Sequence, residues 1–194
     1  MNLNFEELYD KCQNCTDCVL SQTRTNVVFG VGNKETDIMF IGEGPGEQED
    51  LQGEPFVGRS GQLLDKLLAE VSLYRDKNIY IANMVKCRPP GNRNPSADEM
   101  EACKDKLYNQ IKLIAPKIVV CLGKVPACAL IKKDFKITVE HGKIFKIKST
   151  YLMATFHPAA LLRNVNYTPD CQNDLRKIVA FAKKMKTCPE NQEC

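Results

Sequence analysis

Three thiols lie close together near the start of the chain, at Cys12, Cys15 and Cys18. Their spacing makes two overlapping C-x-x-C pairs. A single C-x-x-C pair is compatible with half of a zinc site, a redox pair or coincidence. The nested C-x-x-C-x-x-C run resembles the ligands of an iron–sulfur cluster, although the next cysteine followed by proline that ferredoxins carry is absent. The spacing therefore indicates metal or redox chemistry and leaves the kind of centre open.

Two further cysteines could face the same interior. Cys87 follows a buried strand expected over residues 78–85. Cys103 lies on the apolar face of a helix predicted to begin at Ser96, where Ser96 and Glu99 form a capping box. Cys103 is either a buried structural residue or a ligand that faces Cys87. The other cysteines are assigned no chemistry: Cys121 and Cys128 are interpreted as core residues, and Cys171, Cys188 and Cys194 are given no role.

A glycine-rich segment, residues 42–61, follows an apolar strand expected over residues 38–41 and precedes an amphipathic helix. In α/β proteins this order places a ligand, usually a phosphate, against bare backbone. Neither phosphate-binding glycine motif occurs here, and carboxylates crowd the segment. We therefore expect the segment to approach a flat or cationic group. Its glycines are Gly42, Gly44, Gly46, Gly53, Gly58 and Gly61, and its acids are Glu43, Glu47, Glu49, Asp50 and Glu54.

Three side chains suit the recognition of a planar base: Phe56, Asn83 and His157. An aromatic ring stacks on a base, an amide pairs with its edge, and an imidazole donates to a carbonyl. Acids nearby suit a sugar that develops oxocarbenium character. The chain has only 2 histidines, which excludes a zinc site with three histidines. Taken alone, His157 could be a structural hydrogen-bonding residue and Phe56 a core residue.

Residues that suit contact with DNA follow His157 and also occur in the lysine-rich stretch before it. Leu161 and Leu162 beside Arg163 resemble an apolar wedge that enters a base stack next to a phosphate contact. Alternatively, Leu162 belongs to the core and Arg163 is a solvated charge. Residues 132–150 are predicted to form an edge hairpin with a basic face, which either is simply solvated or contacts a phosphate backbone.

Four buried strands position these residues. They are expected over residues 38–41, 78–85, 117–122 and 151–156, and helices alternate with them, which predicts a parallel sheet covered on both faces. Ligands of such sheets bind at the carboxyl ends of the strands. The glycine-rich segment, Asn83 to Cys87, and His157 all follow such ends. The remaining expected elements are a helix over 4–11, a strand over 27–29, a short helix over 125–131 and a last helix over 168–186.

The composition suits one globular domain over residues 1–194, with 43% hydrophobic and 26% charged residues. A formal charge of +3 permits nucleic-acid binding without requiring it. No apolar run is long enough for a membrane span, and the polar N-terminus lacks the features of a secretory signal. We expect a cytoplasmic protein with no membrane contact.

Together, the motifs closely resemble family 4 uracil-DNA glycosylases, the iron–sulfur branch of the uracil-DNA glycosylase superfamily. The matching segments keep the family's order across residues 14–164. They are NCTDCVL (14–20), RTNVVFG (24–30), GEGPGEQED (42–50), GEPFVG (53–58), GQLL (61–64), NMVKCRPP (83–90) and FHPAALLRN (156–164).

The resemblance implies a three-layer α/β/α fold with a central four-stranded parallel sheet, a [4Fe–4S] cluster, and removal of uracil from DNA. It assigns the cluster to Cys15, Cys18, Cys87 and Cys103, which leaves Cys12 as a spare thiol. In the best-known branch an aspartate activates water at the position of Gly44. The family has glycine there, so no general base is obvious. The implied uracil contacts are Gly42, Glu43, Gly44, Phe56, Asn83 and His157.

These assignments lead to a hypothesis for hydrolytic base excision from single- or double-stranded DNA by a monomer. Phe56 stacks on uracil, Asn83 contacts its edge, and His157 donates as a neutral imidazole to the departing base. Glu43 or Glu47 orients water or stabilises the sugar cation. Leu162, Arg163 and Arg88 contact DNA. Two alternatives stay open: a nucleic-acid-binding module held by zinc or a cluster, and a small iron–sulfur redox protein.

Overall fold

The structure, a computed structural model, describes residues 3–148 and 150–187. Its centre is the predicted set of four parallel strands, with order β3-β2-β4-β6 inside a larger sheet. The pairs β2–β3, β2–β4 and β4–β6 are all parallel, which confirms the predicted parallel sheet. The bounds of these strands are β2 Ile38–Gly42, β3 Tyr80–Asn83, β4 Ile118–Leu122 and β6 Thr150–Thr155.

Two antiparallel edge strands extend the sheet to six strands. β5 (Ile144–Ile147) pairs with β6, so an edge hairpin is present, but it joins β5 to β6 and is not contained in residues 132–150 as predicted. Helix α6 (Ile137–Glu140) occupies the first part of the predicted range. The strand predicted over residues 27–29 is wrong, because the edge strand β1 is Val31–Gly32 and pairs with β3. Val28 N–H does donate to the Lys86 carbonyl at 2.8 Å, but no ladder continues from it within the described residues.

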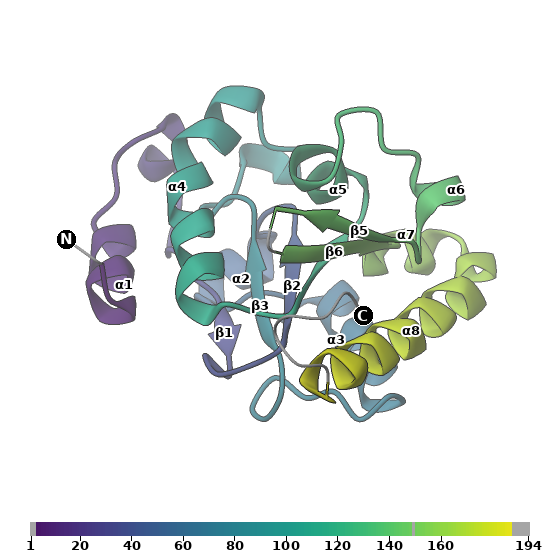
Figure 1. The fold of residues 1–194 in the computed structure, drawn as a ribbon. Coiled ribbons are helices and arrows are strands. Elements are labelled where there is room, and N and C mark those ends of the chain that lie inside the picture. The colour runs from purple at the N-terminus through teal and green to yellow at the C-terminus, as the bar shows by residue number, and fades with distance from the viewer. Residues whose placement is uncertain (1–2, 149, 188–194) are drawn as a thin grey trace.

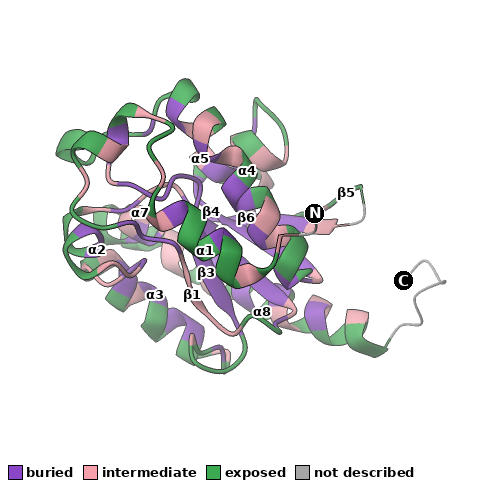
Figure 2. Cartoon of the chain, turned by 90° about the vertical axis from the view of Figure 1, so that its left-hand side faces the viewer, coloured by how far each residue is buried: buried purple, intermediate pink, exposed green. Residues whose placement is uncertain are grey.

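Helices cover both faces of the sheet, as Figure 1 shows. Met39 and Ile41 point to the face covered by α4 (Ala97–Ile114) and α5 (Lys124–Leu130), where Leu107 and Ala127 pack. Phe40 belongs to the opposite face, which α3, α7 and α8 cover. The purple strands of Figure 2 are buried between these layers, which confirms the three-layer α/β/α fold. The other helices are α1 Phe5–Gln13, which packs against α4, α3 Arg59–Ala69, α7 Pro158–Arg163 and α8 Thr168–Thr187.

The glycine-rich segment is less irregular than expected, since it contains helix α2 (Glu47–Gln52). Three acids, Glu47, Glu49 and Asp50, occupy its first turn, where the helix dipole favours negative charge. Gly53 ends the helix with φ of 72°, a left-handed conformation that suits glycine. The acids that argued against a phosphate site thus also stabilise a short helix.

The remaining predictions about elements are confirmed in outline. The capping box at the start of α4 is present, because Ser96 Oγ accepts from Glu99 N–H and the Glu99 carboxylate accepts from Ser96 N–H. Short 3-10 turns complete the chain at Val19–Gln22, Pro90–Asn92 and Val165–Tyr167. Among the described residues, no helix combines the length and apolar character needed to cross a membrane. Cys188 and Cys194 lie outside the described residues.

Candidate active site

A cavity of about 570 Å³ opens beyond the carboxyl ends of β2, β3, β4 and β6. This is the position at which parallel α/β sheets bind ligands, and the volume is typical of small-molecule sites. The cavity brings together most of the predicted uracil contacts, although they are far apart in sequence. The predicted residues in its wall are Glu43, Gly44, Phe56, Asn83, His157 and Arg163.

Asn83 is a buried polar side chain in the wall of this cavity. It ends β3 and is only 1% exposed, and its Oδ1 has no hydrogen-bond partner within the described residues. Leaving a buried polar atom unpaired costs stability, so such an atom is a candidate ligand contact. A Cβ added at Gly42 would collide with both the Asn83 amide and the Phe56 ring. Glycine at position 42 therefore allows the amide and the ring to stand side by side.

Phe56 has an unusual backbone that several neighbours hold in place. Its φ is 55°, in the left-handed region that costs energy for a residue with a side chain. The Arg75 guanidinium donates to the carbonyls of Pro55 and Phe56, and the Arg75 Nε–Asp65 Oδ1 distance is 2.7 Å. A Cβ at Gly61 would strike the Phe56 carbonyl. These contacts fix a ring whose centroid lies 5.6 Å from that of His157.

Glu49 joins the two halves of the glycine-rich segment. Its carboxylate is buried and accepts from Gly46 N–H at 3.1 Å, Val57 N–H at 3.0 Å and Gly58 N–H at 2.9 Å. These bonds tie the start of α2 to the residues that follow Phe56. The sequence analysis counted Glu49 among the acids without a role, and it did not single out Arg75. Both are positioning residues for Phe56.

Replacing Arg75 by methionine should lower the rate of the uracil release that the family resemblance implies. The variant leaves two backbone carbonyls unpaired and frees Phe56 to leave its left-handed conformation. Displacement of a group that positions the substrate, here the ring of Phe56, lowers the rate by about 10- to 100-fold. Single-turnover release from a uracil-containing oligonucleotide measures the effect. The matched control is Arg176→Met, since Arg176 on α8 is not part of the cavity wall. An unchanged rate in Arg75→Met would leave Arg75 with a purely structural role.

His157 is held as a neutral hydrogen-bond donor. It is the N-cap of α7, and its Nδ1 accepts from Ala159 N–H at 3.1 Å, which leaves the ring proton on Nε2. Burial and, to a smaller extent, the positive charge of Arg163 lower the pKa of His157 to about 4, and the charge of Glu49 opposes the shift. The backbone between β4 and α5 approaches closely, because Gly123 has φ of 95° and a Cβ there would lie 2.9 Å from His157 Cβ.

The lowered pKa of His157 predicts how folding stability and the implied uracil release depend on pH. The native pKa of about 4 lies below the ordinary value of 6.5, so in this window the unfolded chain binds a proton that the folded chain does not. Stability should therefore fall as the pH is lowered through the window. Uracil release should stay level from about pH 8 to about pH 6 and decline only near pH 4. A rate profile that declines around pH 6.5 would contradict this assignment.

The two predicted catalytic acids lie in different environments. Glu43 is half-buried in the cavity wall, and burial raises its pKa. Glu47 is exposed and outside the cavity wall, with its Oε1 3.7 Å from the Arg88 guanidinium. The structure thus brings only Glu43 to the other predicted contacts.

The rim of the cavity carries exposed apolar and basic side chains. Leu162 is 49% exposed, which excludes the alternative that it is a core residue, whereas Leu161 is buried. Arg163 follows on the same helix and lines the cavity. Arg93 and Lys124 also line the cavity, and the sequence analysis did not single them out. The rim can therefore meet both bases and phosphates.

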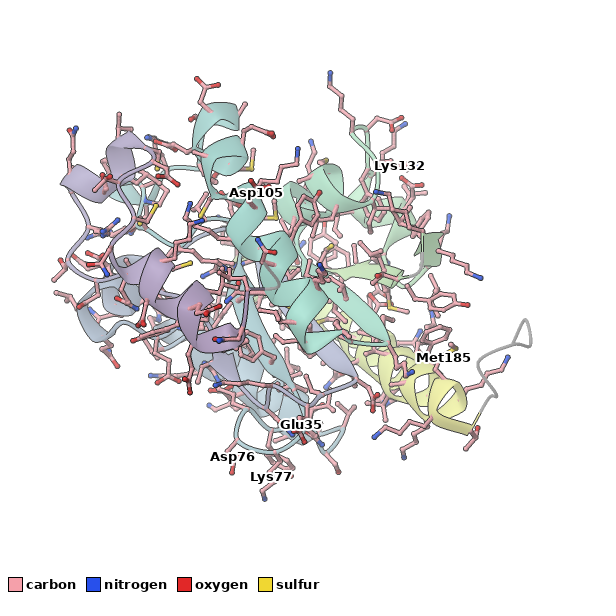
Figure 3. All side chains as sticks on the ribbon, turned by 60° about the vertical axis from the view of Figure 1, so that its left-hand side comes forward. Glu35, Asp76, Lys77, Asp105, Lys132 and Met185 are labelled. Atoms are coloured by element: carbon pink, nitrogen blue, oxygen red, sulfur yellow. The ribbon has the colours of Figure 1, made fainter. Side chains whose placement is uncertain are left out.

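A second cavity gathers the cysteines of the N-terminal motif with those of α4 and the segment after β3. Sulfur atoms can be seen between the N-terminal segment and α4 in Figure 3. The four predicted ligands line this cavity, and Cys12, predicted to be a spare thiol, lines it as well. The described residues form no group of three or more His, Cys, Asp or Glu side chains arranged for a single metal ion. The cysteines in the wall are Cys12, Cys15, Cys18, Cys87 and Cys103.

The surroundings of this cavity suit negatively charged sulfur. Arg24 donates to Cys87 Sγ at 3.4 Å and to the Cys15 carbonyl at 2.7 Å. Lys86 and Lys106 are also part of the wall. Cysteine sulfurs that bind one tetrahedral zinc ion lie about 4 Å from one another. In a four-iron cluster each iron binds one cysteine thiolate, so the cysteine sulfurs lie farther apart. The cavity wall contains the four thiols that a cluster with one thiolate on each iron requires.

Comparison with known proteins identifies the family. Residues 29–180 match the family model described as Uracil DNA glycosylase superfamily. The chain is 44% identical over 176 residues to the type-4 uracil-DNA glycosylase of Thermotoga maritima, covering 90% of this chain and 88% of that protein. It is 39% identical over 183 residues to the type-4 enzyme of Archaeoglobus fulgidus, covering 90% and 92%. The chain belongs to the type-4 uracil-DNA glycosylases.

This membership confirms the family that the motifs predicted, and with it the class of enzyme, a DNA glycosylase. A third type-4 uracil-DNA glycosylase, from Sulfurisphaera tokodaii, is 42% identical over 188 residues and covers 92% of this chain and 85% of its own length. The segment that matches the superfamily contains every residue in the wall of the 570 Å³ cavity, from Glu43 to Arg163. Cys15 and Cys18 precede it, so the cysteine cavity joins residues inside and outside the superfamily region.

Proposed function

We propose that this chain hydrolyses the N-glycosidic bond of deoxyuridine in DNA, releasing uracil and leaving an abasic site for base excision repair. The printed names of its relatives state uracil-DNA glycosylase activity. One observation carries the proposal to this chain: the unpartnered amide oxygen of Asn83 stands beside the ring of Phe56 and the imidazole of His157 in one cavity. This set matches what recognition of an extruded base requires.

Uracil enters the cavity by leaving the base stack. Phe56 stacks on its face. The oxygen of Asn83 accepts from the imide N–H of uracil while the amide nitrogen donates to a ring carbonyl. Cytosine presents an acceptor and an amino group at the same edge, so it cannot form this pair. Gly42 and Gly44 bring backbone close to the base, and a Cβ at Gly44 would lie 2.8 Å from Val85 Cγ2.

Bond cleavage leaves negative charge on uracil and positive charge on the sugar. His157 donates from Nε2–H to the uracil oxygen that gains charge, in a site where donors are fixed before the reaction. Gly44 supplies no carboxylate, so Glu43 is the acid that orients water or stabilises the sugar cation. Glu47 acts, if at all, through its contact with Arg88. Water then attacks the anomeric carbon of the sugar and forms its hydroxyl, and the proton that the water loses passes to Glu43 or to solvent. The departing uracil anion takes up a proton from solvent, which completes hydrolysis.

DNA lies across the rim of the cavity. Leu162 fills the gap that the extruded nucleotide leaves, while Arg163 and Arg88 contact phosphates. The cost of extrusion is a few kcal/mol and is smallest for mispaired or single-stranded uracil. Both single- and double-stranded DNA are therefore substrates, and a monomer suffices because one chain supplies every contact.

We assign a [4Fe–4S] cluster to the cysteine cavity, with Cys15, Cys18, Cys87 and Cys103 as ligands. The type-4 name of the relatives, the common cavity and the basic neighbours Arg24, Lys86 and Lys106 support this assignment. When bound, the cluster supplies a rigid tie among the N-terminal segment, the segment after β3, and α4. Iron and sulfide analysis separates it from zinc.

Incubation with a uracil-containing oligonucleotide tests the function. Alkali treatment should cleave the strand at uracil and leave the same strand with thymine intact. Binding without cleavage would instead support a nucleic-acid-binding module, and reversible reduction without uracil preference would support a redox protein. The same assay with hypoxanthine and xanthine defines the range of deaminated bases.

A further inference from the structure

Lys86 lines the cysteine cavity and forms a hydrogen bond to Asn83, which lines the other cavity. Its side chain is part of the cysteine cavity wall and is only 2% exposed. Its Nζ donates to the backbone carbonyl of Asn83 at 2.9 Å, the residue assigned to the edge of uracil. An ammonium group has three donors, and within the described residues this carbonyl is its one hydrogen-bond partner. A single buried side chain therefore connects the sulfur ligands to the residue that contacts the base.

The counter-charge of Lys86 must come from sulfur. A buried cation is expensive unless an anion is near. The carboxylates of the cysteine cavity already have other partners, since Asp17 pairs with Lys106 at 2.7 Å and Glu99 pairs with Arg93 at 2.6 Å. Cys87 and Cys103, two of the proposed ligands, are buried in the same cavity wall as Lys86. Their sulfurs carry negative charge when they ligate a metal centre.

The backbone around Asn83 depends on this contact. After β3 ends, Met84 N–H donates to the Gly42 carbonyl at 2.9 Å, and Val28 N–H donates to the Lys86 carbonyl at 2.8 Å. These bonds hold the neighbours of Asn83, while its own carbonyl faces the Lys86 ammonium. Moving Lys86 would therefore shift the Asn83 amide relative to Phe56 and Gly42.

We propose that Lys86 is a positioning residue that couples cluster occupancy to uracil binding. The negative charge of the ligated sulfurs holds the ammonium in place, and the ammonium holds the Asn83 carbonyl. Loss of the cluster leaves Lys86 a buried cation without a partner charge, and the end of β3 loosens. The inference rests on the proposed uracil site and the proposed cluster. Because such coupling is reciprocal, uracil in the pocket must also stabilise the cluster.

Reciprocity gives a test that needs only the wild-type holoenzyme. The rate of cluster loss to an iron chelator is followed by the decay of visible absorbance, with and without saturating free uracil. Uracil should slow the loss at least about fivefold, and cytosine should not. An unchanged rate in the presence of uracil, in protein that excises uracil normally, would overturn the coupling and leave the proposed function intact. Absence of excision would instead overturn the function.

Two variants locate the coupling in Lys86. Lys86→Met keeps the length of the side chain and removes the charge and the bond to Asn83, so uracil should no longer slow cluster loss. Lys106→Met is the matched control, because Lys106 lines the same cavity and pairs with Asp17. Its cluster should be lost faster, but uracil should still slow that loss. Equal protection by uracil in wild type and Lys86→Met would contradict the role of Lys86.

If Lys86→Met fails to fold, Lys86→Arg takes its place, because arginine restores the charge. In Lys86→Arg, uracil should slow cluster loss at least in part. No such protection would contradict the proposal.

Discussion

Replacing His157 by asparagine should lower the rate of uracil release by about 10²- to 10³-fold, the loss typical of removing one donor to a developing oxyanion. His157 performs two tasks that this substitution separates. Its Nδ1 caps α7 by accepting from Ala159 N–H, which leaves Nε2–H as the donor that we propose for the departing uracil. Asparagine is a good N-cap, so the helix keeps its cap while the imidazole donor is lost. Single-turnover kinetics on a uracil-containing oligonucleotide measures the effect.

The thermal unfolding of the same variant is the control for structure. An unchanged midpoint together with a large rate loss assigns the effect to the donor. His157→Ala removes both the cap and the donor, so it should show a similar rate loss and a lower midpoint, since losing a cap costs about 1 kcal/mol. A wild-type rate in His157→Asn would remove the imidazole from the mechanism and leave it a helix cap.

Replacing Cys15 by alanine should give colourless protein that unfolds at a lower temperature. A cluster ligated by four cysteines cannot close when one ligand is missing, and binding free energy of a structural metal centre is folding free energy. The affected part of the chain is large, because the proposed cluster ties Cys15 of the N-terminal motif to Cys87 after β3 and to Cys103 on α4, which line the same cavity. Iron and acid-labile sulfide per chain, visible absorbance and the unfolding midpoint measure the outcome.

Cys12→Ala is the matched control, three residues away and in the same cavity wall. Cys12 is 1% exposed, so losing its sulfur leaves a small void that costs about 1 kcal/mol, but the cluster should remain. Colourless Cys12→Ala beside coloured Cys15→Ala would shift the ligand set by one cysteine. The two variants thus test an assignment that the overlapping C-x-x-C pairs could not make by spacing.

The parallel sheet could be predicted because its strands are continuous apolar runs between helices. The same runs placed Asn83 and His157 at strand ends, and the structure brings both to one cavity. The motifs named the family, and the comparisons confirm it. These inferences use signals that lie within short segments of the chain.

The residues that hold the site in place could not be found in this way. Arg75 acts on the carbonyl of Phe56 across 19 residues, and no local pattern marks that contact. Glu49 looked like one acid among several, and only the fold shows that it accepts three backbone N–H bonds. Lys86 resembled an ordinary basic residue beside Cys87, although it is buried. Tertiary contacts, rather than residue type, assign these roles.

The most direct measurement of the central claim follows both products of one reaction. The holoenzyme is incubated in ¹⁸O-labelled water with an oligonucleotide that contains a single uracil among thymines, and the products are analysed by mass spectrometry. We predict free uracil of unchanged mass, ¹⁸O in the abasic sugar, and no free thymine, since water attacks the sugar and the pocket selects uracil. Absence of free uracil, or release of thymine at a comparable rate, would contradict the account.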